Sequence, residues 1–109
     1  MIQLRADDRV LLLGIPPASE ITSIARELMD GVVVALGDRE EVRAACVAMA
    51  EFKNVMFLEA VPDQIPWRAA YFTKIIVPPH LESLLPHAAA ELHRLLAPGG
   101  QIVKTATSA

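Results

Sequence analysis

The sequence contains little cysteine and no excess of positive charge. Its single cysteine, Cys46, has no partner for a disulfide within the chain. This is typical of the reducing cytoplasm, where we expect the protein to reside. Lysine and arginine number 10 against 13 aspartate and glutamate residues, which gives a net charge of −3. Nucleic-acid-binding surfaces usually carry a basic patch. The sequence shows none, so we expect no nucleic-acid partner.

Long apolar segments are absent as well. No apolar run approaches the ~20 residues that a membrane-spanning helix needs. Residues 1–8 lack the charged-then-apolar pattern of a secretion signal. We therefore expect neither a membrane span nor a cleaved leader. Hydrophobic residues nevertheless make up 53 % of the 109 residues, which is enough to build a core. A chain of this length typically forms one domain, here residues 1–109.

Apolar residues change their spacing several times along the chain, between the continuous runs of buried strands and the spacing of helices. Strands are predicted at Val10–Leu13, Val32–Leu36, Val55–Leu58, Lys74–Val77 and Gln101–Thr105. The segments between them favour helices, except that Glu59–Thr73 carries two prolines and has room for one irregular turn. Strands that alternate with helices through short loops form a parallel sheet with right-handed crossovers. The sequence therefore predicts an α/β fold with five parallel strands and helices on both faces.

Polar residues mark where the first two helices begin. Ser19 is the predicted N-cap of a helix over Glu20–Asp30, with Gly31 as its stop. Asp38 and Glu41 have the spacing of a capping box, in which each side chain accepts a hydrogen bond from the other residue's backbone N–H. A third helix is predicted to begin near a proline, because proline suits the first turn. That proline is Pro86, and the predicted inner face is Ala89, Leu92 and Leu96.

Histidines, the cysteine and the tryptophan could each carry chemistry, but their spacing favours structural roles. His80, His87 and His93 are not spaced for shared metal coordination, and no acid pair or cysteine completes such a site. We expect surface histidines and no metal. Cys46 belongs to the apolar face of the second helix, which predicts a core thiol rather than a nucleophile. Trp67 is predicted to cap the core under a short loop.

Several segments resemble a known family. Residues 96–100 read Leu-Ala-Pro-Gly-Gly between a predicted helix and a buried strand, and residues 65–67 read Ile-Pro-Trp ahead of the fourth strand. Together with a first strand that ends at Gly14, they resemble the class I S-adenosylmethionine-dependent methyltransferases from about Leu4 to Thr105. The resemblance implies a doubly wound, Rossmann-like sheet in the order 3-2-1-4-5. It also implies that the family's C-terminal hairpin is lacking, since the sequence ends at Ala109.

The resemblance assigns ligand positions, and several of them carry residues that the family does not use. The first loop keeps Gly14, but the family's second and third glycines fall at Pro16 and Ala18. Proline holds φ near about −65° and has no N–H, so this loop cannot take the family's shape and has lost a donor. The acid of the first strand is replaced by Leu12. The position that often carries an acid near the adenine is Val61.

The acid that binds the ribose hydroxyls in the family falls at Gly37, with Asp38 one residue later. Two interpretations of Asp38 stay open. It is the helix cap alone, or a slip of one residue also places it at the ribose. Open sheets bind ligands at the carboxyl ends of their strands. The candidate cofactor-binding residues at these ends are Gly14, Ile15, Asp38, Ala60 and Val61, and no catalytic residue is predicted.

Two functions are compatible with this pattern. The first is a methyltransferase-like domain without cofactor or methyl-transfer activity, which acts as a binding or assembly module. The alternative is a minimal S-adenosylmethionine-dependent methyltransferase whose substrate side is completed by a partner chain. In both, the strand Gln101–Thr105 forms an open edge of the sheet. Because unpaired edges are usually blunted or paired, we expect a homodimer or a hetero-partner at this strand.

Overall fold

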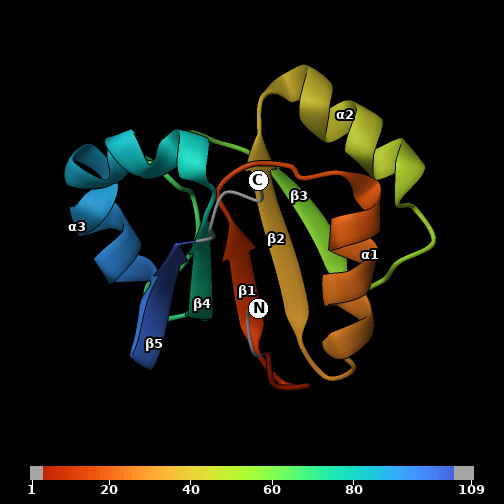
Figure 1. Cartoon of the computed structure of the whole chain (residues 1–109), viewed down its shortest axis with the longest axis horizontal. Coiled ribbons are helices and arrows are strands. Elements are labelled where there is room, and N and C mark those ends of the chain that lie inside the picture. The colour runs from red at the N-terminus through yellow and green to blue at the C-terminus, as the bar shows by residue number, and fades with distance from the viewer. Residues whose placement is uncertain (1–3, 105–109) are drawn as a thin grey trace.

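The chain folds into an open, twisted sheet of five parallel strands with helices on both sides (Figure 1). This computed structural model describes residues 4–104. The elements in chain order are β1 (Arg9–Leu12), α1 (Ala18–Glu27), β2 (Val32–Gly37), α2 (Arg39–Ala48), β3 (Val55–Glu59), β4 (Phe72–Val77), the short 3₁₀ helix η1 (Pro79–Leu84), α3 (Leu85–Leu95) and β5 (Leu96–Lys104). The strand order is β3-β2-β1-β4-β5, with every pairing parallel. The predicted fold class and strand order are confirmed.

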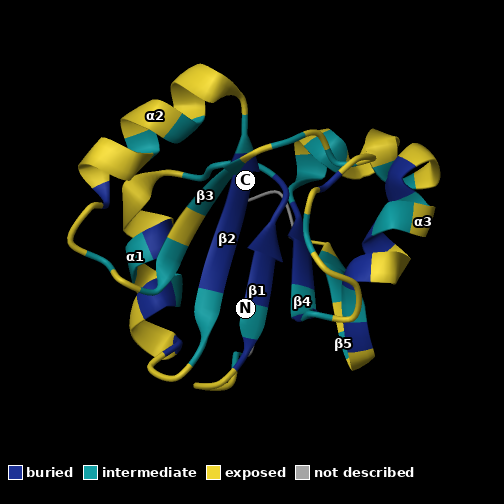
Figure 2. Ribbon diagram, turned by 180° about the vertical axis from the view of Figure 1, so that it is seen from behind, coloured by how far each residue is buried: buried dark blue, intermediate teal, exposed yellow. Residues whose placement is uncertain are grey.

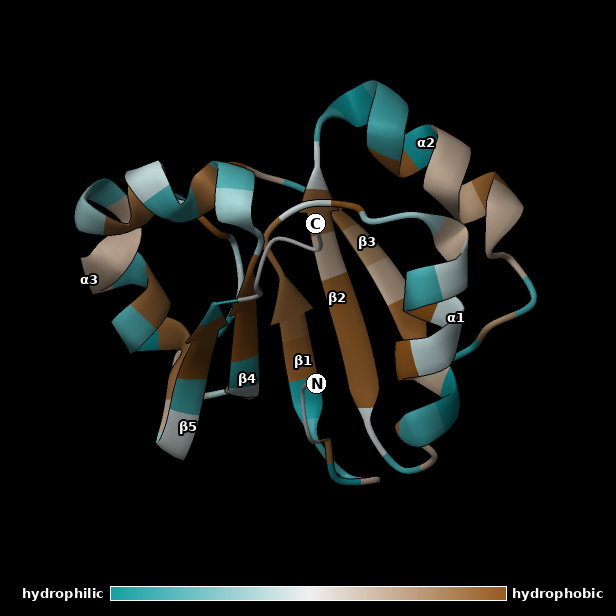
Figure 3. Cartoon of the chain, in the orientation of Figure 1, coloured by the Kyte–Doolittle hydropathy of each residue, from teal (hydrophilic) through white to brown (hydrophobic). Residues whose placement is uncertain are grey.

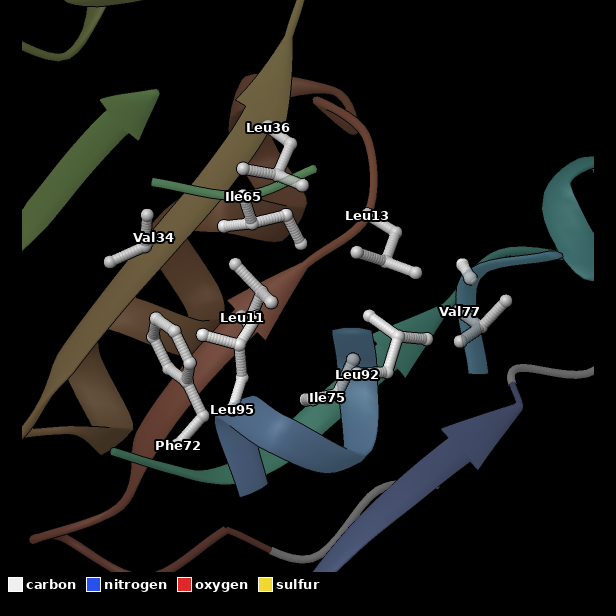
Figure 4. Packing of buried hydrophobic residues seen from close by; sticks show 11 residues of the cluster. Leu11, Leu13, Val34, Leu36, Ile65, Phe72, Ile75, Val77, Leu92 and Leu95 are labelled. Carbon is white, nitrogen blue, oxygen red and sulfur yellow. The ribbon is translucent and has the colours of Figure 1, made fainter. Parts of the chain in front are cut away.

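The strands are apolar because both faces of the sheet are covered (Figures 2 and 3). Successive residues of a strand point to opposite faces. Leu11 accordingly belongs to one core cluster, whereas Val10 and Leu12 belong to the other. Leu92 and Leu95 of α3 pack into the first cluster (Figure 4). Ile21 of α1 packs into the second. The two clusters hold the sheet as the middle layer of three.

The start of α1 differs from the prediction. The helix begins at Ala18, so Ser19 lies in its first turn, and the N-cap is Pro17, which makes no side-chain capping bond. Pro17 has φ −53°, and its carbonyl oxygen accepts hydrogen bonds from the N–H groups of Glu20 and Ile21 at 2.9 and 3.3 Å. A proline whose φ already suits a helix entry therefore displaces the serine cap.

The helix α1 also ends earlier than predicted, at Glu27. Gly31 does not stop the helix but lets the chain pass close to the start of β1. A Cβ atom on Gly31 would lie 2.1 Å from the carbonyl oxygen of Asp8. Glycine is needed here for this close approach of two backbones.

The capping box of α2 is confirmed, whereas the apolar face to which Cys46 was assigned is covered only in part. Asp38 Oδ1 accepts from Glu41 N at 2.8 Å, and Glu41 Oε1 accepts from Asp38 N at 3.0 Å. None of the residues of α2 is buried. The prediction of a core thiol is wrong, because Cys46 is exposed. This helix lies beside the edge strand β3 at a corner of the molecule (Figure 1), where little of its surface meets the sheet.

The helix α3 begins next to Pro86, as predicted, and is preceded by η1. Its buried face is shifted by one position from the predicted one for two of the three residues. It consists of Ala88, Leu92 and Leu95 rather than Ala89, Leu92 and Leu96. The shift arises because the helix ends at Leu95, and Leu96 is already extended, with φ −72° and ψ 130°.

The strand β5 starts at Leu96 rather than at Gln101. Its register against β4 shifts within residues 97–100, so the predicted Pro-Gly-Gly turn is an irregular bulge within the strand. Gly99 adopts φ +80° there, a conformation that favours glycine. The predicted end of the strand, Thr105, lies outside the described residues. Within residues 4–104, no helix is long and apolar enough to cross a membrane.

A buried carboxylate joins the first and fourth strands at the amino end of the sheet. Asp8 is 4 % exposed. It accepts hydrogen bonds from Arg5 N and from the Thr73 hydroxyl, both at 2.8 Å. Burial alone would raise the pKa of Asp8, but these two hydrogen bonds, helped by the charges of Lys74 and Arg5, lower the pKa below its ordinary value. Ionised Asp8 therefore stabilises the fold.

Because the folded chain lowers the pKa of Asp8, the stabilisation is complete above the unfolded value of about 3.9 and is lost as pH falls through the folded value. Urea unfolding followed by circular dichroism will show a stability difference between wild type and Asp8→Asn that is largest near neutral pH and shrinks below about pH 4. The exposed neighbour Asp7 supplies the control, Asp7→Asn. A difference between wild type and Asp8→Asn that is independent of pH contradicts the assignment.

Candidate functional site

Ligands of open parallel sheets bind at the carboxyl ends of the strands, next to the point where the strand order reverses. Here that point lies between β1 and β4. Gly14 follows β1 with φ +134°. A Cβ atom placed on Gly14 would lie 3.7 Å from Leu81 Cδ1 and 3.9 Å from Pro78 Cγ. The side chain that follows β4 and one from η1 therefore lie at ordinary contact distance from this position.

Ile15 fills the space between the ends of β1 and β2. A Cβ atom on Gly37 would lie 2.7 Å from Ile15 Cδ1 and 3.1 Å from Ile15 Cγ1. A larger residue at this position would require the isoleucine side chain to shift. Ile15 also packs against the core cluster on the α1 side of the sheet. The first loop is thus anchored by its own side chain over the end of β2.

An open pocket lies one strand further along the same edge, at the ends of β2 and β3. Its volume is about 580 Å³, within the range of small-molecule sites. The lining residues are Gly37, Asp38, Arg39, Glu59, Ala60, Val61, Gln64, Ile65 and Pro66. Three of the five predicted site residues, Asp38, Ala60 and Val61, are brought together here. Gly14 and Ile15 do not line the pocket.

The geometry of Asp38 is compatible with both of its interpretations. Its Oδ1 atom is used by the capping box, in the bond from Glu41 N. Its Oδ2 atom makes no hydrogen bond within the described part of the chain, and the residue is exposed at the mouth of the pocket. A carboxylate has lone pairs enough for both roles. The cap therefore leaves one oxygen free for a ligand.

Other pocket residues were not predicted from the sequence. Glu59 is the last residue of β3, and Gln64, Ile65 and Pro66 belong to the connection between β3 and β4. This connection holds no helix, as predicted, and turns back through a bridge between Val61 and Gln64. The turn brings residues 64–66 over the end of β3. The signal in the sequence was the pair of prolines, which excluded a helix here.

The histidines and the tryptophan occupy the positions that were predicted for them. His80, His87 and His93 are exposed, and residues 4–104 contain no cluster of potential metal ligands. Trp67 packs on the core beside Phe72, with ring centroids 5.7 Å apart. This confirms the predicted position over the core. The Trp67 indole N–H is buried and has no hydrogen-bond partner among the described residues.

No family model matches the sequence, and no curated protein matches it. Solved structures do match its fold. An S-adenosylmethionine-dependent methyltransferase from Aquifex aeolicus aligns over 92 % of this chain with a TM-score of 0.78 and 20 % identity. The fibrillarin/Nop5p complex aligns over 95 % with a TM-score of 0.75 and 18 % identity. The [4+2]-cyclase SpnF aligns over 91 % with a TM-score of 0.74 and 22 % identity.

These similarities show the fold. The chain has the class I methyltransferase-like fold, and it spans about half of the length of these structures, namely 56 %, 52 % and 38 %. The predicted resemblance is confirmed at the level of the fold. At these identities the neighbours' activities are not carried over, because one fold hosts many functions.

Proposed function

We propose that this chain is a methyltransferase-like domain without methyl-transfer activity, which acts as a binding or assembly module. The observation that carries the proposal is the packing at the end of β1. Ile15 lies against Gly37, and Leu81 and Pro78 lie at van der Waals distance from the position that a Cβ on Gly14 would take. We infer that a cofactor seated at the switch point would have to displace these side chains. The carboxyl edge of the sheet therefore has an open pocket at the ends of β2 and β3, whereas side chains of the chain itself lie at the switch point between β1 and β4.

The first loop supports the same conclusion. Ligands with charged groups are usually held in such folds by backbone N–H groups at the start of the first helix. Pro16 and Pro17 carry no N–H. The amides of Glu20 and Ile21 already donate to the Pro17 carbonyl oxygen. The loop has few donors left for a ligand, and its prolines make it too stiff to rearrange easily.

Assembly would use the strand β5, which forms one edge of the sheet. Ile102 and Val103 are half-buried, whereas Gln101 and Lys104 are exposed. Two copies related by a two-fold axis can pair their β5 strands antiparallel. With the axis at Ile102, the two Ile102 side chains lie opposite each other, and Lys104 of one copy lies opposite Gly100 of the other. This register places no like charges face to face, which is why we propose a homodimer.

A second candidate function is a minimal S-adenosylmethionine-dependent methyltransferase completed by a partner chain. The open pocket favours it. Apolar Ala60, Val61 and Ile65 could cover a flat ring, and the free oxygen of Asp38 could accept hydrogen bonds from ribose hydroxyls. The neighbour solved as the fibrillarin/Nop5p complex gives a precedent for this fold in an assembly with another protein. The packing of Leu81 and Pro78 beside Gly14 weighs against this candidate.

Isothermal titration with S-adenosylmethionine tests the first proposal. We expect no binding tighter than a Kd of about 10 μM for the wild type. The double variant Ile15→Gly/Pro16→Gly removes the Ile15 side chain and restores an amide donor, so its affinity should rise. Ser19→Ala, at an exposed position in the first turn of α1, is the control and should behave as wild type. Tight binding by the wild type would refute the proposal.

The second candidate is tested at Asp38. Asn is as good an N-cap as Asp, so Asp38→Asn should keep the stability of the wild type while losing the charge offered to ribose hydroxyls. Asp38→Ala should lose about 1 kcal/mol of stability. If the pocket binds adenosine through this carboxylate, both variants bind it more weakly in the same titration. Unchanged adenosine affinity in Asp38→Ala removes the residue from the site.

The homodimer is tested at Ile102, which faces its own copy across the axis. Ile102→Lys places two lysines opposite each other and should weaken the dimer, whereas Ile102→Val keeps an apolar pair and should dissociate like the wild type. Each cross-strand pair contributes about 0.2–1 kcal/mol. Sedimentation equilibrium measures the dissociation constants of the two variants, and circular dichroism checks that each variant folds. Equal dissociation constants, or monomers at every concentration, would rule out this pairing.

A further inference from the structure

One wall of the pocket is held by charged side chains of a helix that does not line it. Ile65 lies in the β3–β4 connection, with its side chain in the core beside Leu36 (Figure 4). Its N–H donates to Glu91 Oε2 at 2.6 Å, and its carbonyl oxygen accepts from Arg94 Nη2 at 2.9 Å. Both backbone groups of Ile65 are thus satisfied by side chains of α3.

Arg94 makes further hydrogen bonds, two of them with the β3–β4 connection. Its Nη1 donates to the carbonyl oxygen of Trp67 at 2.9 Å, and its Nε donates to Glu91 Oε1 at 2.6 Å. Its own carbonyl oxygen accepts from Ala70 N at 2.9 Å. The planar fork of a guanidinium can bind two carbonyls and a carboxylate in a fixed arrangement, which an ammonium group cannot reproduce. Residues 65–70 are therefore fixed to α3 by one arginine.

The ion pair itself would contribute little to stability. Arg94 and Glu91 are 39 % and 18 % exposed, and exposed pairs of this kind are weak. The hydrogen bond from Arg94, followed by the one from Ile65 N, lowers the pKa of Glu91. The pair stays charged at neutral pH. Its consequence is geometric, since it determines where the backbone of residues 65–67 lies.

We propose that Glu91 and Arg94 are positioning residues for the pocket, which hold the Gln64–Pro66 wall over the ends of β2 and β3 without contacting a ligand. The placement of the wall stands on the contacts above. Only its effect on ligand affinity rests on the second candidate function, in which the pocket binds a nucleoside. Opening of the wall is a local event, because the sheet beneath it is held by its own ladder.

Amide hydrogen exchange followed by NMR tests the proposal without any ligand. Glu91→Ala removes the acceptor of the Ile65 N–H, so exchange of the Ile65 amide should accelerate about tenfold or more, given the strength of hydrogen bonds to charged groups. The amide of Val34, in the buried β2, should not change. Glu91→Gln keeps an acceptor oxygen and should restore much of the protection. His93→Ala, at an exposed position between the two residues, is the matched control.

Arg94→Lys tests whether the guanidinium fork is needed. In this variant Trp67 should be more accessible to acrylamide than in the wild type. Trp67 is the only tryptophan of the chain, so its accessibility to acrylamide reports directly on this connection. Equal acceleration at Ile65 and Val34 would mean global destabilisation and would overturn the proposal, as would wild-type exchange in Glu91→Ala. If Glu91→Ala fails to fold, Glu91→Gln and Arg94→Lys decide the question through the same two measurements.

Titration with adenosine separates this proposal from the proposed function. If the wild type binds adenosine, Glu91→Ala should bind it about tenfold more weakly, and unchanged affinity would overturn the positioning role. If the wild type does not bind adenosine, the second candidate function fails. The exchange of Ile65 and the quenching of Trp67 then still decide whether the two residues hold the wall.

Discussion

Ile15 lies against Gly37 where β1 and β2 end side by side, and the rest of the carboxyl edge is arranged around this contact. Glycine at position 37 lets the isoleucine come within 2.7 Å of the place a Cβ would occupy. Pro16 and Pro17 then lead directly into α1 without offering an N–H. The edge is consequently divided. Side chains of the chain itself lie beside Gly14 at β1 and β4, where such sheets usually bind ligands, and an open pocket lies at the ends of β2 and β3.

Features that depend on local chemistry were predictable from the sequence. The strands were found because continuous apolar runs are needed wherever both faces of a sheet are covered. The box of Asp38 and Glu41 was found because its two hydrogen bonds involve only those residues. Ser19 was misassigned because Pro17, with φ already suited to a helix, takes the cap position. Cys46 was misplaced because periodicity identifies the apolar face of a helix but not whether another element covers it.

The candidate site was predictable only where the chain order determines it. Asp38, Ala60 and Val61 each follow a parallel strand, so the topology alone brings them to one edge. Gly14 follows a strand too, but it does not line the pocket; its neighbours are Leu81 and Pro78, and nothing in the sequence indicates that packing. Glu91 and Arg94 could not be predicted at all. They look like an ordinary ion pair on a helix surface, and their partners are backbone groups far away in the sequence.

The connection between β3 and β4 explains why a common fold need not imply a common activity. The same sheet occurs in a methyltransferase, in the fibrillarin/Nop5p complex and in a cyclase, so the strands do not select the chemistry. In this chain the connection has no helix of its own to satisfy its backbone groups. Buried peptide groups must find partners, and here α3 supplies them through Arg94 and Glu91. The shape of the pocket therefore depends on the helix that packs on β4 and β5. A change at that distant edge can reach the pocket through two side chains, although the sheet between them stays fixed.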